Sequence, residues 1–229
     1  MSKALVVFSG GQDSTTCLYW ALHKFGVGEV VALSFDYHQR HRIELDCARQ
    51  VASLVNVPHT LLPINTFAAL GANALTGDLP VVAEPNPLNG LPNTFVPGRN
   101  LIFLTFAAAY AYSQGIRHLV TGVTQIDYSG YPDCRATTLH ALEQTLRLGM
   151  EYDITLHAPL IDLSKHDVVL LASNLGALPA MAWTHTCYEG RRPPCGECSA
   201  CRIRAKGFAE AGIIDPLIAR SYAVDKKLR

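Results

Sequence analysis

Apolar residues in this 229-residue chain occur either in short continuous runs or with helical spacing. The continuous runs predict buried strands at residues 4–9, 30–35, 59–64, 118–123 and 154–160. Between them, the helical spacing predicts helices at residues 14–25, 43–55, 100–114, 137–150 and 165–175. Strands and helices that alternate through short connections favour parallel strands with right-handed crossovers. We therefore expect an α/β fold, with a Rossmann-like, doubly wound, parallel sheet of five strands.

Two segments depart from this alternation. Residues 71–100 contain five prolines with glycine and asparagine between them, which predicts a long irregular loop, and such loops are often functional. The last 45 or so residues hold a cluster of cysteines and predict a small separate module. We expect an α/β domain at residues 1–180 and a C-terminal module at residues 181–229.

Four of the seven cysteines fall within 15 residues, at Cys187, Cys195, Cys198 and Cys201. Cys-x-x-Cys spacing lets two sulfurs approach one ion, and tetrahedral Zn²⁺ takes four. An iron–sulfur cluster also takes four thiolates, so it stays open as an alternative, although zinc is favoured. With four protein ligands and no open position, the single expected zinc ion would be structural.

Charge and hydropathy argue against a nucleic-acid-binding protein and against a membrane protein. The 19 basic and 19 acidic residues balance, which argues against a large nucleic-acid-binding surface. The first apolar run is too short for a signal peptide, and the longest, residues 101–112, is about half of the ~20 residues that a bilayer needs. We expect a cytoplasmic protein that contacts neither membranes nor nucleic acid, in a reduced compartment where clustered cysteines bind metal.

The string SGGQDS, residues 9–14, follows the first predicted strand directly. Gly10 and Gly11 let backbone amides approach a ligand, and the helix that follows presents its free N–H groups to the same place. The alternative is a tight turn with an Asp or Ser cap. A Walker A ending and the dinucleotide fingerprint are both absent here. Asp13 would be repelled by a polyphosphate unless it caps backbone N–H groups or meets Mg²⁺, and both roles stay open.

The SGGQDS string resembles the pyrophosphate-binding loop of the ATP pyrophosphatase (PP-loop) superfamily. Together with the cysteines, other strings extend a resemblance to the 7-cyano-7-deazaguanine synthase family over nearly the whole chain. They are FDYHQRH (35–41), NTFVPGRN (93–100), TGV (121–123), DYSGYPDCR (127–135) and CGECSAC (195–201). One residue departs from the pattern: His38 stands where the family has glycine after the Asp-Tyr pair.

The resemblance implies an adenine nucleotide alpha-hydrolase-like fold and an ATP-dependent C–N ligase of queuosine biosynthesis. ATP, with Mg²⁺, would adenylate the carboxylate of 7-carboxy-7-deazaguanine, and ammonia would displace AMP to give an amide. A second adenylation would convert the amide to the nitrile, 7-cyano-7-deazaguanine. No glutaminase domain fits in this length, so ammonia would enter free. A homodimer is compatible with this reading.

The resemblance also assigns residues. The ATP site would comprise Phe8, Ser9, Gly10, Gly11, Gln12, Asp13, Ser14, Thr15, Thr16, Cys17 and Leu18. Lys165 would neutralise charge on the α-phosphate, unless it is merely a solvated lysine in a first helical turn. Arg99 would pair with phosphate or with the substrate carboxylate, unless it only begins a helix. Asp13 completes the catalytic candidates.

Asp127, Tyr131 and Asp133 lie on one loop and are the candidates for binding the substrate. An acid accepts hydrogen bonds from guanine-like N–H groups, and a tyrosine stacks on a base; ordinary turn chemistry is an equal alternative. Two rival functions remain. A tRNA-thiolating or other amidating adenylase would need a basic surface, and a zinc-knuckle nucleic-acid-binding protein leaves the glycine loop unexplained.

Overall fold

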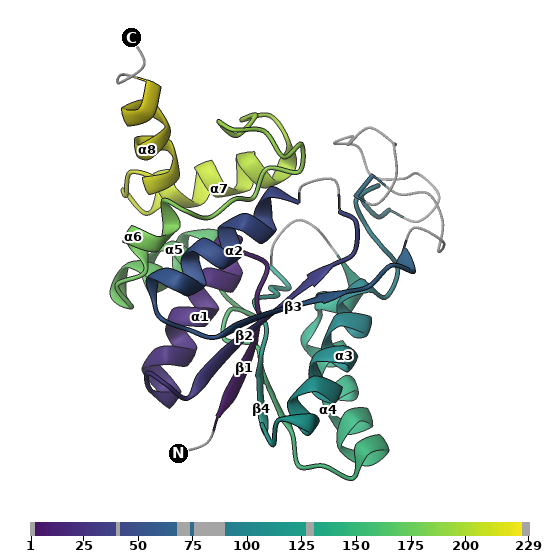
Figure 1. Cartoon of the computed structure of the whole chain (residues 1–229). Helices are drawn as coiled ribbons and strands as arrows, with labels where there is room; N and C mark the ends of the chain where they lie inside the picture. Colours follow the sequence, from purple (N-terminus) through teal and green to yellow (C-terminus); the bar gives the residue numbers. More distant parts are fainter. Residues whose placement is uncertain (1–2, 40–41, 68–73, 76–89, 127–130, 226–229) are drawn as a thin grey trace.

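Five parallel strands form the centre of the computed structural model, which describes residues 3–39, 42–67, 74–75, 90–126 and 131–225 (Figure 1). The strand order is β3-β2-β1-β4-β5, so the chain winds outward in both directions from β1. The strands are β1 (Ala4–Val7), β2 (Val30–Asp36), β3 (His59–Pro63), β4 (His118–Val120) and β5 (Thr155–His157). The expected doubly wound, parallel, five-stranded sheet is confirmed.

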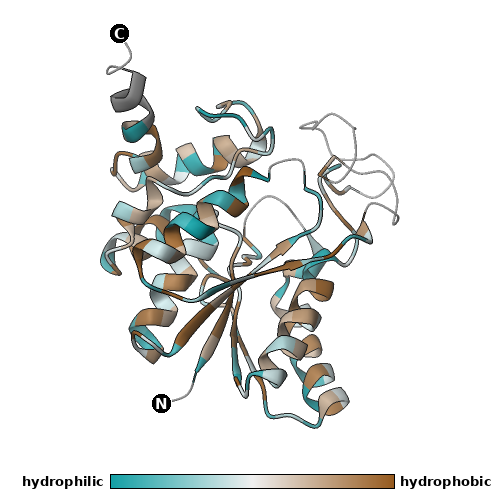
Figure 2. Cartoon of the chain, viewed as in Figure 1, coloured by the Kyte–Doolittle hydropathy of each residue, from teal (hydrophilic) through white to brown (hydrophobic). Residues whose placement is uncertain are grey.

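Helices cover both faces of this sheet, as the layers in Figure 1 show. One face carries α1 (Gln12–Phe25), α2 (Ile43–Leu54) and α5 (Lys165–Asn174). The other face carries α3 (Arg99–Ser113) and α4 (Ala136–Met150). Alternate residues of β1 therefore enter different cores: Ala4 and Val6 pack towards α1, whereas Leu5 packs towards α3. In Figure 2 the apolar residues follow the strands and the helix faces that meet them.

Local sequence explains where the key helices begin. Ser164 begins α5 with a capping box, in which its hydroxyl accepts from the Asp167 N–H and the Asp167 carboxylate accepts from the Ser164 N–H. The expected Ser164 cap is therefore confirmed, and it fixes Lys165 as the first residue of α5. Helix α1 begins two residues before the predicted start, at Gln12, with Gly11 as its N-cap.

Strands β4 and β5 are shorter than the predicted runs at 118–123 and 154–160. After Val120 the chain leaves the sheet and approaches the start of α1. A Cβ on Gly122 would lie 3.0 Å from the Ser14 nitrogen. The run at 118–123 therefore extends beyond β4 because Gly122 packs on the start of α1. The spacing of apolar residues does not distinguish such a contact from a longer strand.

The C-terminal segment adds α6 (Leu178–Met181), α7 (Ser199–Glu210) and α8 (Pro216–Asp225), and a 3₁₀ turn, η2 (Pro132–Cys134), precedes α4. Helix α7 packs on α5, and Phe208 shares a small core with Val169 and Met181. The division of domains at residue 180 stays a prediction. Among the helices in the described ranges, none has the combination of length and hydropathy that spanning a bilayer requires.

Two histidines pair across β4 and β5, with His118 at the start of β4 and His157 at the end of β5. His157 Nε2 lies 3.2 Å from His118 Nδ1, and the rings pack against Trp20 and Phe25 of α1. The Nζ of Lys24 lies 4.7 Å from the centre of the Trp20 ring. Burial, with the charge of Lys24 and the neighbouring His118, lowers the pKa of His157 from 6.5 to about 4.

This pair predicts a pH-dependent stability. Because the folded pKa of His157 lies below its unfolded value, the stabilisation is complete above pH ~6.5 and is lost as the pH falls towards 4. Between pH 7 and 4 the wild type should lose about 1–2 kcal/mol more unfolding free energy than His157→Gln, after allowance for solvent screening. Urea unfolding at both pH values measures this difference. Equal losses in the two proteins would contradict it.

Candidate active site

A cavity of about 310 Å³ opens at the carboxyl ends of β1, β2 and β4. Its walls come from the loop after β1, the end of β2, the segment after β4, the first turn of α3, Lys165 of α5 and three residues of α7. The sheet changes winding direction between β1 and β4, and ligands of doubly wound folds bind at this switch point. The cavity is therefore the candidate site.

Gly10 fixes the path of the loop after β1. Its φ is +82°, and a Cβ there would lie 2.4 Å from the carbonyl oxygen of Glu44 and 2.6 Å from the nitrogen of Ala48, both in α2. A side chain fits neither the dihedral angle nor the space. The Gly10 carbonyl also accepts a hydrogen bond from the His185 N–H at 3.1 Å. The loop is held between α2 and the C-terminal segment.

The hydroxyls of Ser9 and Ser14 close the same loop. The Ser9 N–H donates to Ser14 Oγ at 3.2 Å, and Ser14 Oγ donates to the Gly11 carbonyl at 3.2 Å. In the described structure no side chain caps the N-terminus of α1. The residues of its first turn, Gln12, Asp13 and Ser14, line the cavity beside Gly11, and an uncapped helix N-terminus at a cavity wall favours an anion.

Asp13 and Lys165 form an ion pair at this end of the cavity. Lys165 Nζ lies 2.9 and 2.8 Å from the two carboxylate oxygens of Asp13. The Lys165 side chain is only 12% exposed and that of Asp13 29%. The interpretation of Lys165 as a solvated lysine is therefore wrong. Sequence reasoning left Asp13 as a cap or metal contact and missed the pairing, because nothing local relates residues 152 positions apart.

Arg99, the first residue of α3, lies in the cavity wall among three tyrosines, Tyr37, Tyr131 and Tyr188. Its Nη1 donates to the Tyr37 hydroxyl at 3.5 Å. Burial raises the pKa of all three phenols, so they are neutral at pH 7. Burial opposes the charge of Arg99, but its polar neighbours raise its pKa and keep it protonated. No carboxylate in the described ranges forms an ion pair with Arg99, so the site favours an incoming anion.

Flat aromatic side chains surround this guanidinium. Phe35 and Phe103 stack with ring centres 4.6 Å apart, and Tyr37 packs on Phe103 at 5.2 Å. All three line the cavity. This end therefore suits a planar ring that carries a negative group. No local pattern indicated Phe103 or Tyr188, which reach the site from separate segments.

The loop candidates for substrate binding lie in different surroundings. Tyr131 lines the cavity, and its hydroxyl pairs with Thr94 Oγ1 at 2.6 Å. Asp133 is 4% exposed and accepts from the backbone N–H of Asn100 at 3.0 Å, which supports the start of α3. Asp127 lies outside the described residues.

Six of the eleven candidates for ATP binding line the cavity, and five do not. Phe8, Ser9 and Gly11–Ser14 line the cavity, whereas Gly10 packs on α2 and residues 15–18 are buried inside α1. Gln12 is 2% exposed, and its Nε2 has no hydrogen-bond partner among the described residues. A buried amide donor of this kind at a cavity wall is available to a ligand.

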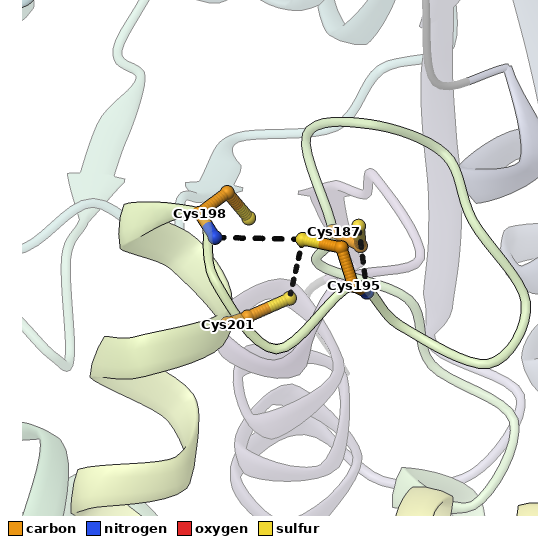
Figure 3. A group of neighbouring side chains, drawn as sticks. All are labelled: Cys187, Cys195, Cys198 and Cys201. Atoms are coloured by element: carbon orange, nitrogen blue, oxygen red, sulfur yellow. Dashed lines mark hydrogen bonds between the residues drawn. The ribbon is translucent and has the colours of Figure 1, made fainter. Parts of the chain in front are cut away.

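The four clustered cysteines meet beside the start of α7 (Figure 3). Their sulfurs lie within 4.8 Å of one another, and those of Cys195 and Cys201 are 3.8 Å apart. Four Zn–S bonds of ~2.3 Å in a tetrahedron require sulfurs about 3.8 Å apart. Hydrogen bonding from Cys201 lowers the pKa of Cys198 to about 4, which favours a thiolate. The cluster fits a structural metal ion.

Comparison with known proteins gives a family and close relatives. The family model described as queuosine biosynthesis protein QueC matches residues 3–212. The 7-cyano-7-deazaguanine synthase of Chromobacterium violaceum is 65% identical over 96% of this chain and 95% of its own. The protein of the same name from Laribacter hongkongensis is 64% identical over 96% of both chains. That of Clostridium botulinum is 47% identical over 91% of this chain and 95% of its own.

Gly10 yields a test of the loop geometry. Gly10→Ala should lower the free energy of unfolding by about 2–5 kcal/mol, because it adds both a strained dihedral angle and a clash with α2. Gly26→Ala is the matched control: φ is +99° there, but a Cβ would meet nothing within 4 Å. It should cost about 1–3 kcal/mol, from the strained dihedral angles alone. Denaturant unfolding of both variants checks this, and equal costs would refute the close approach to α2.

Proposed function

Because the chain belongs to the queuosine biosynthesis protein QueC family, we propose that it converts 7-carboxy-7-deazaguanine and ammonia to 7-cyano-7-deazaguanine at the expense of ATP. One observation carries the proposal: a single cavity joins an anion-binding loop to an aromatic compartment that contains a charged arginine. Such a cavity accommodates a polyphosphate and a planar carboxylic acid together. The reaction is a ligation that ATP drives by adenylating its substrate.

In the first half, Arg99 holds the substrate carboxylate while the deazapurine ring packs among the aromatic side chains. One carboxylate oxygen attacks the α-phosphorus of ATP, a new P–O bond forms, and pyrophosphate leaves. The glycine loop and the N-terminus of α1 bind the departing pyrophosphate, because their N–H groups face the developing negative charge. Ammonia then attacks the acyl carbon, AMP leaves with the former carboxylate oxygen, and loss of a proton gives the amide.

The second half repeats the same phosphate chemistry. The amide oxygen attacks the α-phosphorus of a second ATP, and pyrophosphate leaves again. Loss of AMP and a proton from the adenylated imidate leaves the nitrile. One loop serves both halves, because each half develops charge on the same phosphates.

Lys165 acts at the phosphate end. Its ammonium neutralises the α-phosphate as negative charge shifts towards the leaving group, and Asp13 holds it in place until ATP binds. Mg²⁺ bound with ATP supplies further neutralisation of the phosphates. Asp13 and Glu44 are the acidic residues among the described lining of the cavity that would hold it.

Other properties of the family extend the proposal. The ion in the cysteine cluster is a structural Zn²⁺, one per chain, held by Cys187, Cys195, Cys198 and Cys201. The substrates are small molecules, with no direct contact to nucleic acid. We propose further that the protein works in the cytoplasm; a homodimer is compatible with this activity.

The products test the reaction directly. Purified protein with ATP, Mg²⁺, ammonium and 7-carboxy-7-deazaguanine should yield the nitrile together with AMP and pyrophosphate, at about two AMP per nitrile. Mass spectrometry and nucleotide chromatography measure both. Formation of ADP and phosphate instead would refute adenylation.

A lysine variant tests the phosphate end. Lys165→Ala should lower kcat for AMP formation by about 10²–10³-fold, the usual cost of losing one charge that stabilises a transition state. Lys206→Ala, a control on the solvent-exposed side of α7, should keep full activity because that side chain is 70% exposed. Unchanged turnover in Lys165→Ala would remove the residue from the site.

Metal analysis tests the cysteine cluster. The wild type should hold about one zinc per chain, and Cys198→Ser should lose the ion and unfold at a lower temperature. Cys47→Ser is the control, because Cys47 lies in α2 outside the cluster. It should retain the zinc. A wild type that keeps its stability without any metal would contradict the structural role.

A further inference from the structure

Gly207 stands inside helix α7, where glycine is a poor helix former. Its φ lies outside the left-handed range, so the conformation of the backbone does not require glycine there. The reason for glycine is space. A Cβ on Gly207 would lie 2.5 Å from Lys165 Cγ, 3.0 Å from the Lys165 carbonyl oxygen and 3.1 Å from its carbonyl carbon.

Two of these three atoms belong to the backbone of α5. A change of side-chain rotamer at Lys165 would relieve the contact with Cγ but would leave the contacts with the carbonyl group. A side chain at position 207 therefore requires the stem of Lys165 to shift and its carbonyl group to give by a few tenths of an ångström. The absence of a side chain sets the distance between the two helices at the residue that begins α5.

Other contacts hold α7 in place, so it cannot easily move away from α5. Arg204, one turn before Gly207, is 4% exposed and pairs with Asp215 through two hydrogen bonds of 2.7 and 2.8 Å. It also donates to Thr184 Oγ1 at 2.8 Å. Ala200, Ile203 and Arg204 line the cavity, and Gly207 follows them on the same face of the helix.

We infer that Gly207 is a positioning residue for Lys165. The bare backbone of α7 packs along the stem of Lys165 and directs its Nζ to Asp13 at the phosphate end of the cavity. The inference rests on the role of Lys165 in the proposed function. It gives the helix that begins in the cysteine cluster a part in adenylation without any contact between the metal site and a reactant.

Gly207→Ala tests the inference, with Gly149→Ala in α4 as the matched control. Both add one methyl group inside a helix, but a Cβ at Gly149 meets nothing within 4 Å. Gly207→Ala should lower kcat for AMP formation about 10–100-fold, the cost of misplacing a reacting group by about 1 Å. The KM for the carboxylic acid should change less than about twofold, because Arg99 and the aromatic wall lie elsewhere in the cavity. Gly149→Ala should match the wild type.

A double variant separates positioning from general damage. If Gly207 acts through Lys165, Lys165→Ala/Gly207→Ala should turn over at the rate of Lys165→Ala alone. If the losses in kcat of the two single variants multiply in the double variant, the inference is overturned. It is also overturned if Gly207→Ala keeps the wild-type kcat while Lys165→Ala is impaired. Zinc content and melting temperature of Gly207→Ala show that the module has stayed folded.

A second readout needs no turnover at all. Acetylation of Lys165 by acetic anhydride, followed by peptide mass spectrometry, should be about 5–10-fold faster in Gly207→Ala than in the wild type, because the largely buried ion pair opens. Equal labelling rates would overturn the inference even in an active enzyme. A wild type that forms no AMP would refute the proposed function alone, since the labelling difference would still report the geometry.

Discussion

The ion pair between Lys165 and Asp13 connects the first helix of the chain with the fifth. It lies at the point where β1, α1 and α5 meet the cavity. Two opposite charges at this depth lose hydration, and they stabilise the structure only when each compensates the other. Removing either partner leaves an uncompensated charge beside the glycine loop. The pair therefore constrains the relative placement of α1 and α5 and, with it, the phosphate end of the site.

The same pair explains how the charge of Lys165 is compensated while the cavity holds no ligand. In the proposed reaction, an arriving polyphosphate would replace Asp13 as the anionic partner of Lys165, so the charge of Lys165 would be compensated in both states. Arg99 is in a different situation, because its described neighbours are neutral phenols and a more distant carboxylate. An anion gains most from Arg99, and on this difference rests our proposal that the substrate carboxylate binds at the aromatic end and the phosphates at the other.

Local patterns predicted the elements well, because strands and helices follow the spacing of apolar residues. The cysteine cluster was also predictable, since its four sulfurs lie close in sequence. The contacts that build the site were not. Asp13 and Lys165 are 152 residues apart, and Phe103 and Tyr188 come from segments with no shared motif. The structural roles of Gly122 and Gly207 could not be predicted from the sequence, because each role depends on the helix that the glycine contacts.

Three glycines share one physical role at this site. Gly10 lies against α2, Gly122 against the start of α1 and Gly207 against Lys165, and in each case a Cβ would come within about 3 Å of backbone atoms. Close backbone approach brings the N-terminus of α1 and Lys165, the first residue of α5, to one cavity, where in the proposed reaction they would act on the same phosphates. Larger residues would separate these elements while leaving every charged group present. Catalysis by charge stabilisation depends steeply on distance, so in the proposed reaction these three glycines would contribute through the close spacing that they allow.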